Sequence, residues 1–274
     1  METPEAARSD PKWVDCMTLA FPRELPMQYE FEELRFYVRA CYPHYYNLIT
    51  RMLNSKRAKV VTVTDNPGIG KSLFYAYFFL RYRAENEATS IITISFAKEN
   101  NASVLKEVVV WKGDRVVAAT SNSLAIGNLI EKAEKEAKSN VIHLYNGSPK
   151  IAAASARAVC FTSSDKSWFD HIKKSQYRPK LFMPLWDLRE LQTAAKALHL
   201  SVLGGDESPK ALNQDEVEVR FITFGGIVRE YLASDQDFVY QRQHDIEKMV
   251  GQFNDAGIAR RLLQDLESEM VLGC

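Results

Sequence analysis

The chain has 274 residues, of which 46% are hydrophobic and 26% are charged, a composition that is typical of a globular protein and excludes a disordered tail, a collagen-like fibre and a disulfide scaffold. Its 35 lysines and arginines balance its 35 aspartates and glutamates, so the formal net charge is zero. This balance argues against a chain that mainly coats nucleic acid or an anionic membrane, and it leaves a local basic patch open.

The first part of the chain is predicted to be an irregular arm followed by a helix. Four prolines within residues 1–30 interrupt any helix there, because proline lacks the backbone N–H that an interior helical position needs. Aromatic side chains in this arm favour an arm that lies on the protein body. Residues 31–53 are predicted to be helical, with an interruption near Pro43.

Strands and helices then alternate. The run Val60–Thr64 is β-branched and is followed by turn residues, which predicts a buried strand, and a helix is predicted from Lys71 to Ala84. The same reasoning predicts strands at 90–96, 141–145, 156–162 and 181–183, a hairpin at 108–118, and helices at 124–138 and 187–198. The alternation predicts an α/β fold in which helices flank a parallel sheet.

The last part of the chain has a different pattern. From residue 215 it is predicted to be helical, with breaks at Gly225-Gly226 and near Asp235. Residues 204–213 are polar and contain glycine, so they are the best candidate for a linker. We therefore expect an N-terminal arm at 1–30, an α/β core at 31–205 and a helical C-terminal extension at 206–274.

Targeting and metal-binding signals are not evident in the sequence. The four cysteines lie far apart and without the spacing of metal ligands, which predicts reduced thiols in an intracellular protein. The first residues lack the basic and apolar regions of a secretory signal. No apolar run is long enough to cross a bilayer. We expect an intracellular location and no membrane contact.

The strongest motif lies between the strand predicted at 60–64 and the helix that follows it, which is the context that a Walker A phosphate-binding loop requires. It is the run Asp65-Asn66-Pro67-Gly68-Ile69-Gly70-Lys71-Ser72. The two glycines let backbone amides approach a phosphate, and the first amides of the helix attract the anion. Lys71 is expected to reach the outer phosphates, and Ser72 to place its hydroxyl on Mg²⁺. Residues 66–72 are thus the predicted site for ATP, or another nucleoside triphosphate, with Mg²⁺.

One position departs from this motif. Asp65 stands where the motif has its first glycine. If its carboxylate faces the phosphates, the two like charges repel by roughly 1–4 kcal/mol at about 4 Å. The alternative interpretation is a loop that only resembles a phosphate-binding loop.

The acidic partner of such a loop is missing from its expected place. A carboxylate at the end of a later strand normally orients the magnesium ion and the attacking water. Asn146 stands there, and an amide can bond a metal-bound water but supplies no charge and is a poor general base. The position can equally be a strand-ending turn. Asp165 is the fallback acid, and Thr162 or Ser163 is expected to face the γ-phosphate or, alternatively, to serve only in strand-end hydrogen bonding.

A third feature is the run Phe224-Gly225-Gly226-Ile227-Val228-Arg229. A glycine pair that opens a helix allows close backbone approach, and Arg229, one turn on, can reach a phosphate. A glycine break beside a solvated arginine is an equal alternative. The stretch 172–180 has four basic residues in nine, and a solvated loop explains it better than a nuclear-import or nucleic-acid patch does.

Together these stretches resemble the NTPase-like domain of the Crinkler effectors, which oomycetes and some fungi secrete and which is shared with kinetoplastid retrotransposon-hot-spot proteins. The resemblance covers roughly residues 35–240. The matching stretches, in order, are Asn66–Phe74, Leu144–Pro149, Phe161–Ser164, Met183–Trp186 with Glu190-Leu191, and Phe224–Arg229.

The resemblance implies a P-loop ATPase related to AAA+ and STAND proteins. It places Asn146 at the Walker B acid, the segment Thr162–Ser164 at the polar sensor and Arg229 at the C-terminal sensor arginine. Asp65 and Asn146 depart from the family pattern, as does Val228, which stands where proline is common. The resemblance also implies secretion into a host cell, host-protein partners and a nuclear location there, although no translocation header is recognisable in the chain.

The sequence therefore predicts a module that binds ATP with Mg²⁺ and hydrolyses it weakly or not at all. One alternative is a non-enzymatic interaction module that keeps the loop as a relic. Another is a slow but real ATPase that uses Asp165 or a residue of a partner chain. The preferred base, the oligomeric state and any nucleic-acid binding are not determined by the sequence.

Overall fold

The computed structural model describes residues 13, 17–29, 34–55, 58–99, 102–149, 156–163, 165–173, 178–202, 210–251 and 257. The helices are α1 (Cys41–Asn54), α2 (Lys71–Glu85), α3 (Ser123–Ala137), α4 (Lys166–Lys173), α5 (Leu188–Ala197), α6 (Gln214–Phe224), α7 (Val228–Tyr231) and α8 (Gln236–Gly251). The strands are β1 (Thr18–Ala20), β2 (Arg35–Tyr37), β3 (Val60–Thr64), β4 (Ser90–Glu99), β5 (Ala102–Lys112), β6 (Arg115–Thr120), β7 (Val141–Asn146), β8 (Arg157–Phe161), β9 (Lys180–Phe182), β10 (Ser201–Val202) and β11 (Lys210–Ala211).

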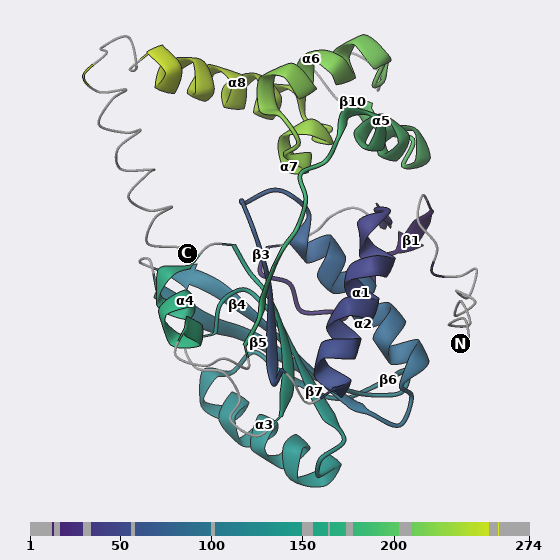
Figure 1. Cartoon of the computed structure of the whole chain (residues 1–274), viewed down its shortest axis with the longest axis vertical. Coiled ribbons are helices and arrows are strands. Elements are labelled where there is room, and N and C mark those ends of the chain that lie inside the picture. Colours follow the sequence, from purple (N-terminus) through teal and green to yellow (C-terminus); the bar gives the residue numbers. More distant parts are fainter. Residues whose placement is uncertain are drawn as a thin grey trace, which may run out of the picture.

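A seven-stranded sheet with the order β6-β5-β4-β7-β8-β3-β9 forms the centre of the molecule (Figure 1). The strands from β4 to β9 in this order are parallel, as the alternation of elements predicted. β5 and β6 add an antiparallel edge. A tight turn between β5 and β6 reverses the chain, so the two strands run antiparallel. Gly113 in this turn has a φ of +56°, which glycine adopts easily.

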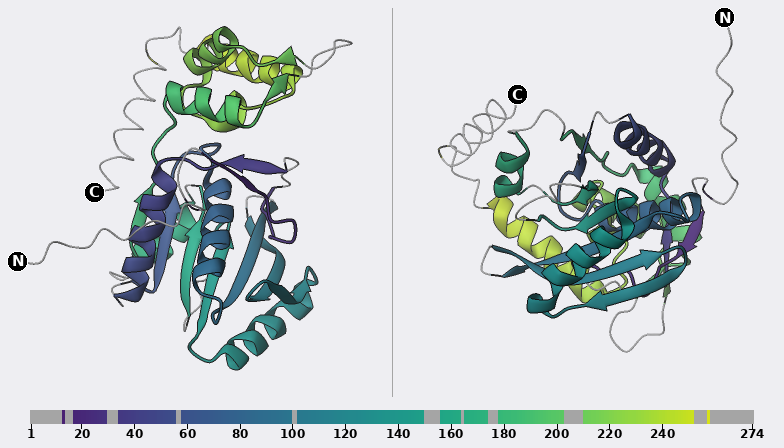
Figure 2. Two further views of the ribbon diagram at one scale, coloured as in Figure 1. Left: turned by 90° about the vertical axis from the view of Figure 1, so that its right-hand side faces the viewer. Right: turned by 90° about the horizontal axis from the view of Figure 1, so that it is seen from below.

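Helices cover both faces of this sheet (Figure 2). On one face, α1 and α2 bury an aromatic core against alternate residues of the strands, such as Ile142 and Leu144. On the other face, α3 and α4 pack against the intervening residues, such as Val141 and Tyr145. Alternate residues of each strand thus belong to two separate cores, which explains why β7 and β8 are buried almost throughout.

A group of helices, α5 to α8, lies beyond the carboxyl ends of the parallel strands (Figures 1 and 2). α5, α6 and α7 share a third hydrophobic cluster, which includes Leu191, Val217 and Tyr231. The cluster contains residues from both sides of 205/206, where the boundary between the α/β core and the helical extension was predicted. That boundary stays a prediction. No helix in the described ranges is long and apolar enough to span a bilayer.

The prediction of a helix across residues 31–53 is wrong for its first part. Residues 35–37 form β2, which pairs antiparallel with β1 of the N-terminal arm, and the helix begins only at Cys41. The partner strand lies 17 residues away in the chain, so local periodicity does not reveal the pairing. Pro43 does not interrupt α1, because it lies in the first helical turn, where the missing N–H has no partner to lose.

Candidate functional site

The loop at residues 65–70 joins β3 to α2 at the carboxyl end of the parallel strands. Gly68 and Gly70 have φ values of +85° and +90°, which residues with a side chain rarely adopt. Gly70 directly precedes α2, and no side chain of the described residues caps that end of the helix. A side chain at Gly68 would also meet α7, since a Cβ there would lie 2.7 Å from Cγ2 of Ile227. The two glycines therefore bend the chain and admit close neighbours.

The carbonyl groups of this loop are bound by donors from three other parts of the fold. These are the Tyr42 hydroxyl, which donates to the Gly70 carbonyl at 3.2 Å, the Trp186 indole Nε1, which donates to the Ile69 carbonyl at 3.0 Å, and the Arg229 amide, which donates to the Gly68 carbonyl at 3.1 Å. The loop is thereby fixed from its outer side by α1, by the segment before α5 and by α7.

The amide groups of the loop are in the opposite situation. Across the residues that the structure describes, no oxygen accepts a hydrogen bond from the amides of residues 68–72. The first amides of a helix have no partner within the helix, and here they continue the row of loop amides. Such an array of unpaired donors at a helix N-terminus is a site for an anion, above all for phosphate.

Lys71 lies within this array. Its Nζ donates to the carbonyl groups of Asp65 at 2.9 Å and Asn66 at 2.5 Å, and the residue is buried. Burial lowers the pKa of Lys71 to about 8, against an attraction from the Asp65 carboxylate and with a further lowering by the nearby Arg229. An anion bound at the loop would favour the charged form of Lys71. It would therefore raise the pKa of this lysine against the lowering caused by burial and by Arg229.

The carboxylate of Asp65 is at the start of the loop. Its Oδ1 accepts a hydrogen bond from the Asn66 amide at 2.6 Å. Its charge acts on Lys71 and on Tyr45 of α1, whose hydroxyl donates to the carbonyl of Phe182 at the end of β9. The carboxylate is therefore close to both Lys71 and α1.

Asn146, the residue at the predicted acid position, ends β7 on the other side of β3. β8 separates the two strands, and the register places Asn146 level with Val63 through Phe161. Two strand spacings correspond to about 9–10 Å. The side chain is buried, and its Oδ1 accepts a hydrogen bond from the Gln28 amide of the N-terminal arm at 2.8 Å. Its Nδ2 has no partner among the described residues.

Two more buried polar atoms near the same end of the sheet have no partner within the described ranges. They are Oγ1 of Thr64, the last residue of β3, and Oγ of Ser95, which is level with Asn146 in the register of β4 and β7. A buried polar group without a partner is costly, and in native structures it indicates a water, an ion or a ligand. The carboxyl end of the sheet thus holds three such groups, on β3, β4 and β7. A fourth buried atom without a partner among the described residues, Oε2 of Glu230, lies 3.5 Å from a Cβ position on Gly68 of the loop.

The side chains at the end of β8 are already engaged. Thr162 donates through Oγ1 to the Ser163 carbonyl at 3.0 Å and lies 2.6 Å from the Ser148 hydroxyl. Asp165 accepts hydrogen bonds from the amide of Trp168 and the hydroxyl of Ser167, so its carboxylate caps the start of α4. Burial alone would raise the pKa of Asp165, but these hydrogen bonds outweigh it and lower the pKa. An ionised, capping carboxylate is a weak candidate for a general base.

Arg229 is the predicted site residue that the tertiary structure brings from furthest away. Besides the bond from its amide to the Gly68 carbonyl, its Cβ lies 3.3 Å from the position that a Cβ on Gly68 would take. Its side chain is exposed and lies close enough to Lys71 to lower that pKa. Residues 66–72 and Arg229 thus meet, with Asn146 and Thr162 on the β8 side of the loop.

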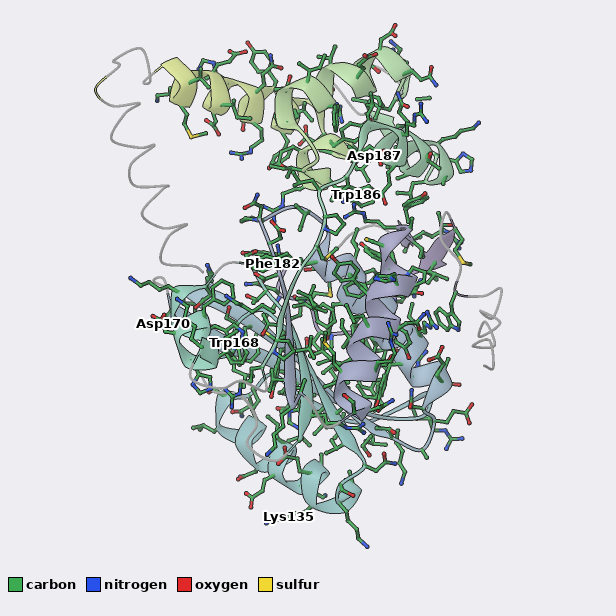
Figure 3. All side chains as sticks on the ribbon, in the orientation of Figure 1. Lys135, Trp168, Asp170, Phe182, Trp186 and Asp187 are labelled. Carbon is green, nitrogen blue, oxygen red and sulfur yellow. The ribbon has the colours of Figure 1, made fainter. Side chains whose placement is uncertain are left out.

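Trp186 and Arg39 contribute to the site although sequence reasoning gave them no role. Arg39 forms a buried, bidentate ion pair with Glu190, at 3.0 Å from Nε to Oε1 and 2.8 Å from Nη2 to Oε2. Its guanidinium also binds the carbonyl groups of Pro184 and Leu185 and lies 4.3 Å from the centre of the Trp186 ring. Figure 3 shows Trp186 on the segment that leads from the end of β9 to α5. The segment Met183–Trp186 was part of the resemblance, but the sequence offered no signal for its contact with the loop.

Comparisons with known proteins add little to this geometry. No protein-family model matches the sequence, and no curated protein matches it. Among solved structures, the chain is similar to a chain in the structure of Drosophila ORC bound to DNA, with 13% sequence identity and a TM-score of 0.40. The match covers 91% of this chain and 65% of the ORC chain, so this chain spans about two thirds of the length of that relative. The protein is a mixed α/β protein with a mostly parallel central sheet flanked by helices, and the Crinkler resemblance rests on the motifs alone.

Proposed function

We propose that the chain binds a nucleoside triphosphate, in the simplest case ATP, with its phosphates on the amides of residues 68–72. The observation that carries this proposal is the row of loop amides, up to the start of α2, that have no acceptor or side-chain cap within the described part of the chain. Two further features support it. Lys71 is a buried cation beside these amides, and Arg229 adds a second positive charge from α7. Phosphate groups are the ligands that such an arrangement favours.

Hydrolysis by this site is proposed to be slow or absent. Turnover needs a group that orients the attacking water, in addition to phosphate contacts. Asn146 offers an amide at that position, and Asp165 is occupied as a helix cap. We expect ATP turnover below the ~1 s⁻¹ low end of ordinary enzymes, measured as phosphate release. Ordinary rates would contradict this part of the proposal and point to an acid from a partner chain.

A second candidate function is an interaction module of the Crinkler type that contacts a host protein. It is favoured by exposed apolar side chains on the helical group, since Ile222 of α6 is 77% exposed and Tyr240 of α8 is 71% exposed. The two functions are compatible, because the nucleotide would bind at the loop and the partner on α6 and α8. Secretion and a location in the host nucleus belong to this candidate.

Calorimetric titration with ATP tests the proposed site. Loss of a charge-assisted phosphate contact costs roughly 1.5–3 kcal/mol, so Lys71→Ala should weaken binding about ten- to a hundredfold. Lys132→Ala is a matched control, because Lys132 is an exposed lysine of α3, and α3 packs on the face of the sheet opposite to α2. Wild-type protein that shows no binding at millimolar ATP, or a Lys71→Ala variant that binds as well as wild type, would contradict the proposal.

A further inference from the structure

We propose that this site takes the nucleotide in its metal-free form, because the buried group at the predicted metal-water position is a hydrogen-bond donor. The inference rests on the proposed nucleotide site and specifies the ligand that the site selects. It departs from the sequence-based expectation that Ser72 and Asn146 hold Mg²⁺ between them.

The orientation of the Asn146 amide is fixed by the N-terminal arm. The Gln28 N–H points at Oδ1 over 2.8 Å, and the reversed amide would set two donors against each other. The arm cannot easily withdraw at this point, because two further hydrogen bonds hold it. One runs from the Tyr75 hydroxyl to the Pro26 carbonyl, and the other from Lys106 Nζ to the Met27 carbonyl. Nδ2 is therefore the atom that Asn146 presents to a ligand.

This donor does not fit the hydration shell of a magnesium ion. Mg²⁺ keeps several waters when it binds, and in nucleotide sites it is held by one or two carboxylates together with the phosphates. A metal-bound water gives a lone pair to the ion and turns its hydrogens outward, so it needs an acceptor. Nδ2 of Asn146 offers only hydrogens. A phosphate oxygen, in contrast, accepts hydrogen bonds and would satisfy it.

The neighbouring unpaired hydroxyl groups are compatible with the same ligand. Those of Thr64 and Ser95 can donate to a phosphate oxygen as Nδ2 does, and neither has another partner in the described part of the chain. The donors at the loop itself are its amides and Lys71, which can bind phosphate oxygens directly.

The carboxylates near the loop differ in what they can offer. Asp165 caps α4, and the charge of Asp65 acts on Lys71. Glu230 has a buried Oε2 without a partner among the described residues, 3.5 Å from a Cβ position on Gly68. It approaches the loop at Gly68, whereas Ser72, the expected metal ligand, belongs to the first turn of α2. In the described ranges, no three histidine, cysteine or acidic side chains gather into a group that could hold a metal.

The test compares ATP binding to the wild-type chain in excess EDTA and in excess Mg²⁺ by calorimetry. We expect the affinity in EDTA to equal or exceed that in Mg²⁺. Binding that is at least tenfold weaker in EDTA would overturn the inference and leave the proposed nucleotide site intact. Absence of binding in both conditions would instead overturn the proposed function and the inference with it.

A pair of variants sharpens the test. Asn146→Asp keeps an oxygen for the Gln28 N–H and exchanges only the buried donor for a charged acceptor. It should weaken metal-free ATP binding by about tenfold, because like charges then face each other, and Mg²⁺ should restore the loss. Asn140→Asp, just before the start of β7, is the control for the added charge. Its Nδ2 donates to the Ala88 carbonyl at 2.8 Å, so this variant also loses a donor, but it should bind ATP as tightly as wild type does. If Asn146→Asp binds metal-free ATP as tightly as wild type does, the inference fails. The wild-type comparison decides the question even if that variant does not fold.

Discussion

Nucleotide affinity should fall about tenfold between pH 7 and pH 9, and the cause is the protonation state of Lys71. Burial lowers the pKa of this lysine to about 8 in the ligand-free chain. About nine tenths of the molecules therefore carry the charge at pH 7, and about one tenth at pH 9. A bound phosphate favours the charged form and raises the pKa again, so binding above pH 8 must take up a proton. The loss corresponds to about 1.4 kcal/mol.

Calorimetry at several pH values, each in two buffers of different ionisation enthalpy, measures the ATP affinity and the number of protons taken up on binding. Proton uptake on ATP binding should rise from nearly none at pH 7 toward one per site at pH 9. The Lys71→Ala variant, which binds more weakly, should show neither the uptake nor the change of affinity. A wild-type affinity that is constant over this range, or an equal slope in Lys71→Ala, would refute the assignment of this charge to the phosphate site.

Three substitutions test the surroundings of the loop. If the Asp65 carboxylate faces the phosphates, Asp65→Gly should tighten ATP binding by about fivefold, since it removes roughly 1 kcal/mol of repulsion; an unchanged affinity in calorimetry would mean that the carboxylate points away from them. Trp186→Phe keeps an aromatic ring but removes the indole N–H that binds the Ile69 carbonyl and part of a buried ring system, so the free energy of unfolding in urea should fall by at least about 1 kcal/mol, and equal stability would show that this side chain does not hold the loop. Arg39→Met should cost about 3 kcal/mol in the same assay, because the part-buried Glu190 and the carbonyl groups of Pro184 and Leu185 lose their donor; adding Glu190→Met should recover part of the loss, and a mild effect of the single change would contradict this.

The strand–loop–helix unit and most of the sheet could be predicted from local sequence. Val60–Thr64 is apolar or β-branched throughout, and the glycines at 68 and 70 lie where the chain takes positive φ values. These signals act over a few residues, so periodicity and turn chemistry are sufficient to find them. The same holds for the hairpin of β5 and β6. It does not hold for β1 and β2, because each has only three residues and forms a strand only by pairing with the other.

What the sequence determined by itself is the row of amides and the lysine that a phosphate would meet, since both lie within one continuous stretch. The tertiary structure decided what surrounds that stretch. It brought the Arg229 amide from α7 and the Trp186 indole from the segment before α5 to the loop carbonyls. It also turned the Asn146 amide by giving its oxygen to Gln28, 118 residues earlier. Hydrogen bonds of this kind depend on which segments the fold places side by side, and no local pattern records that.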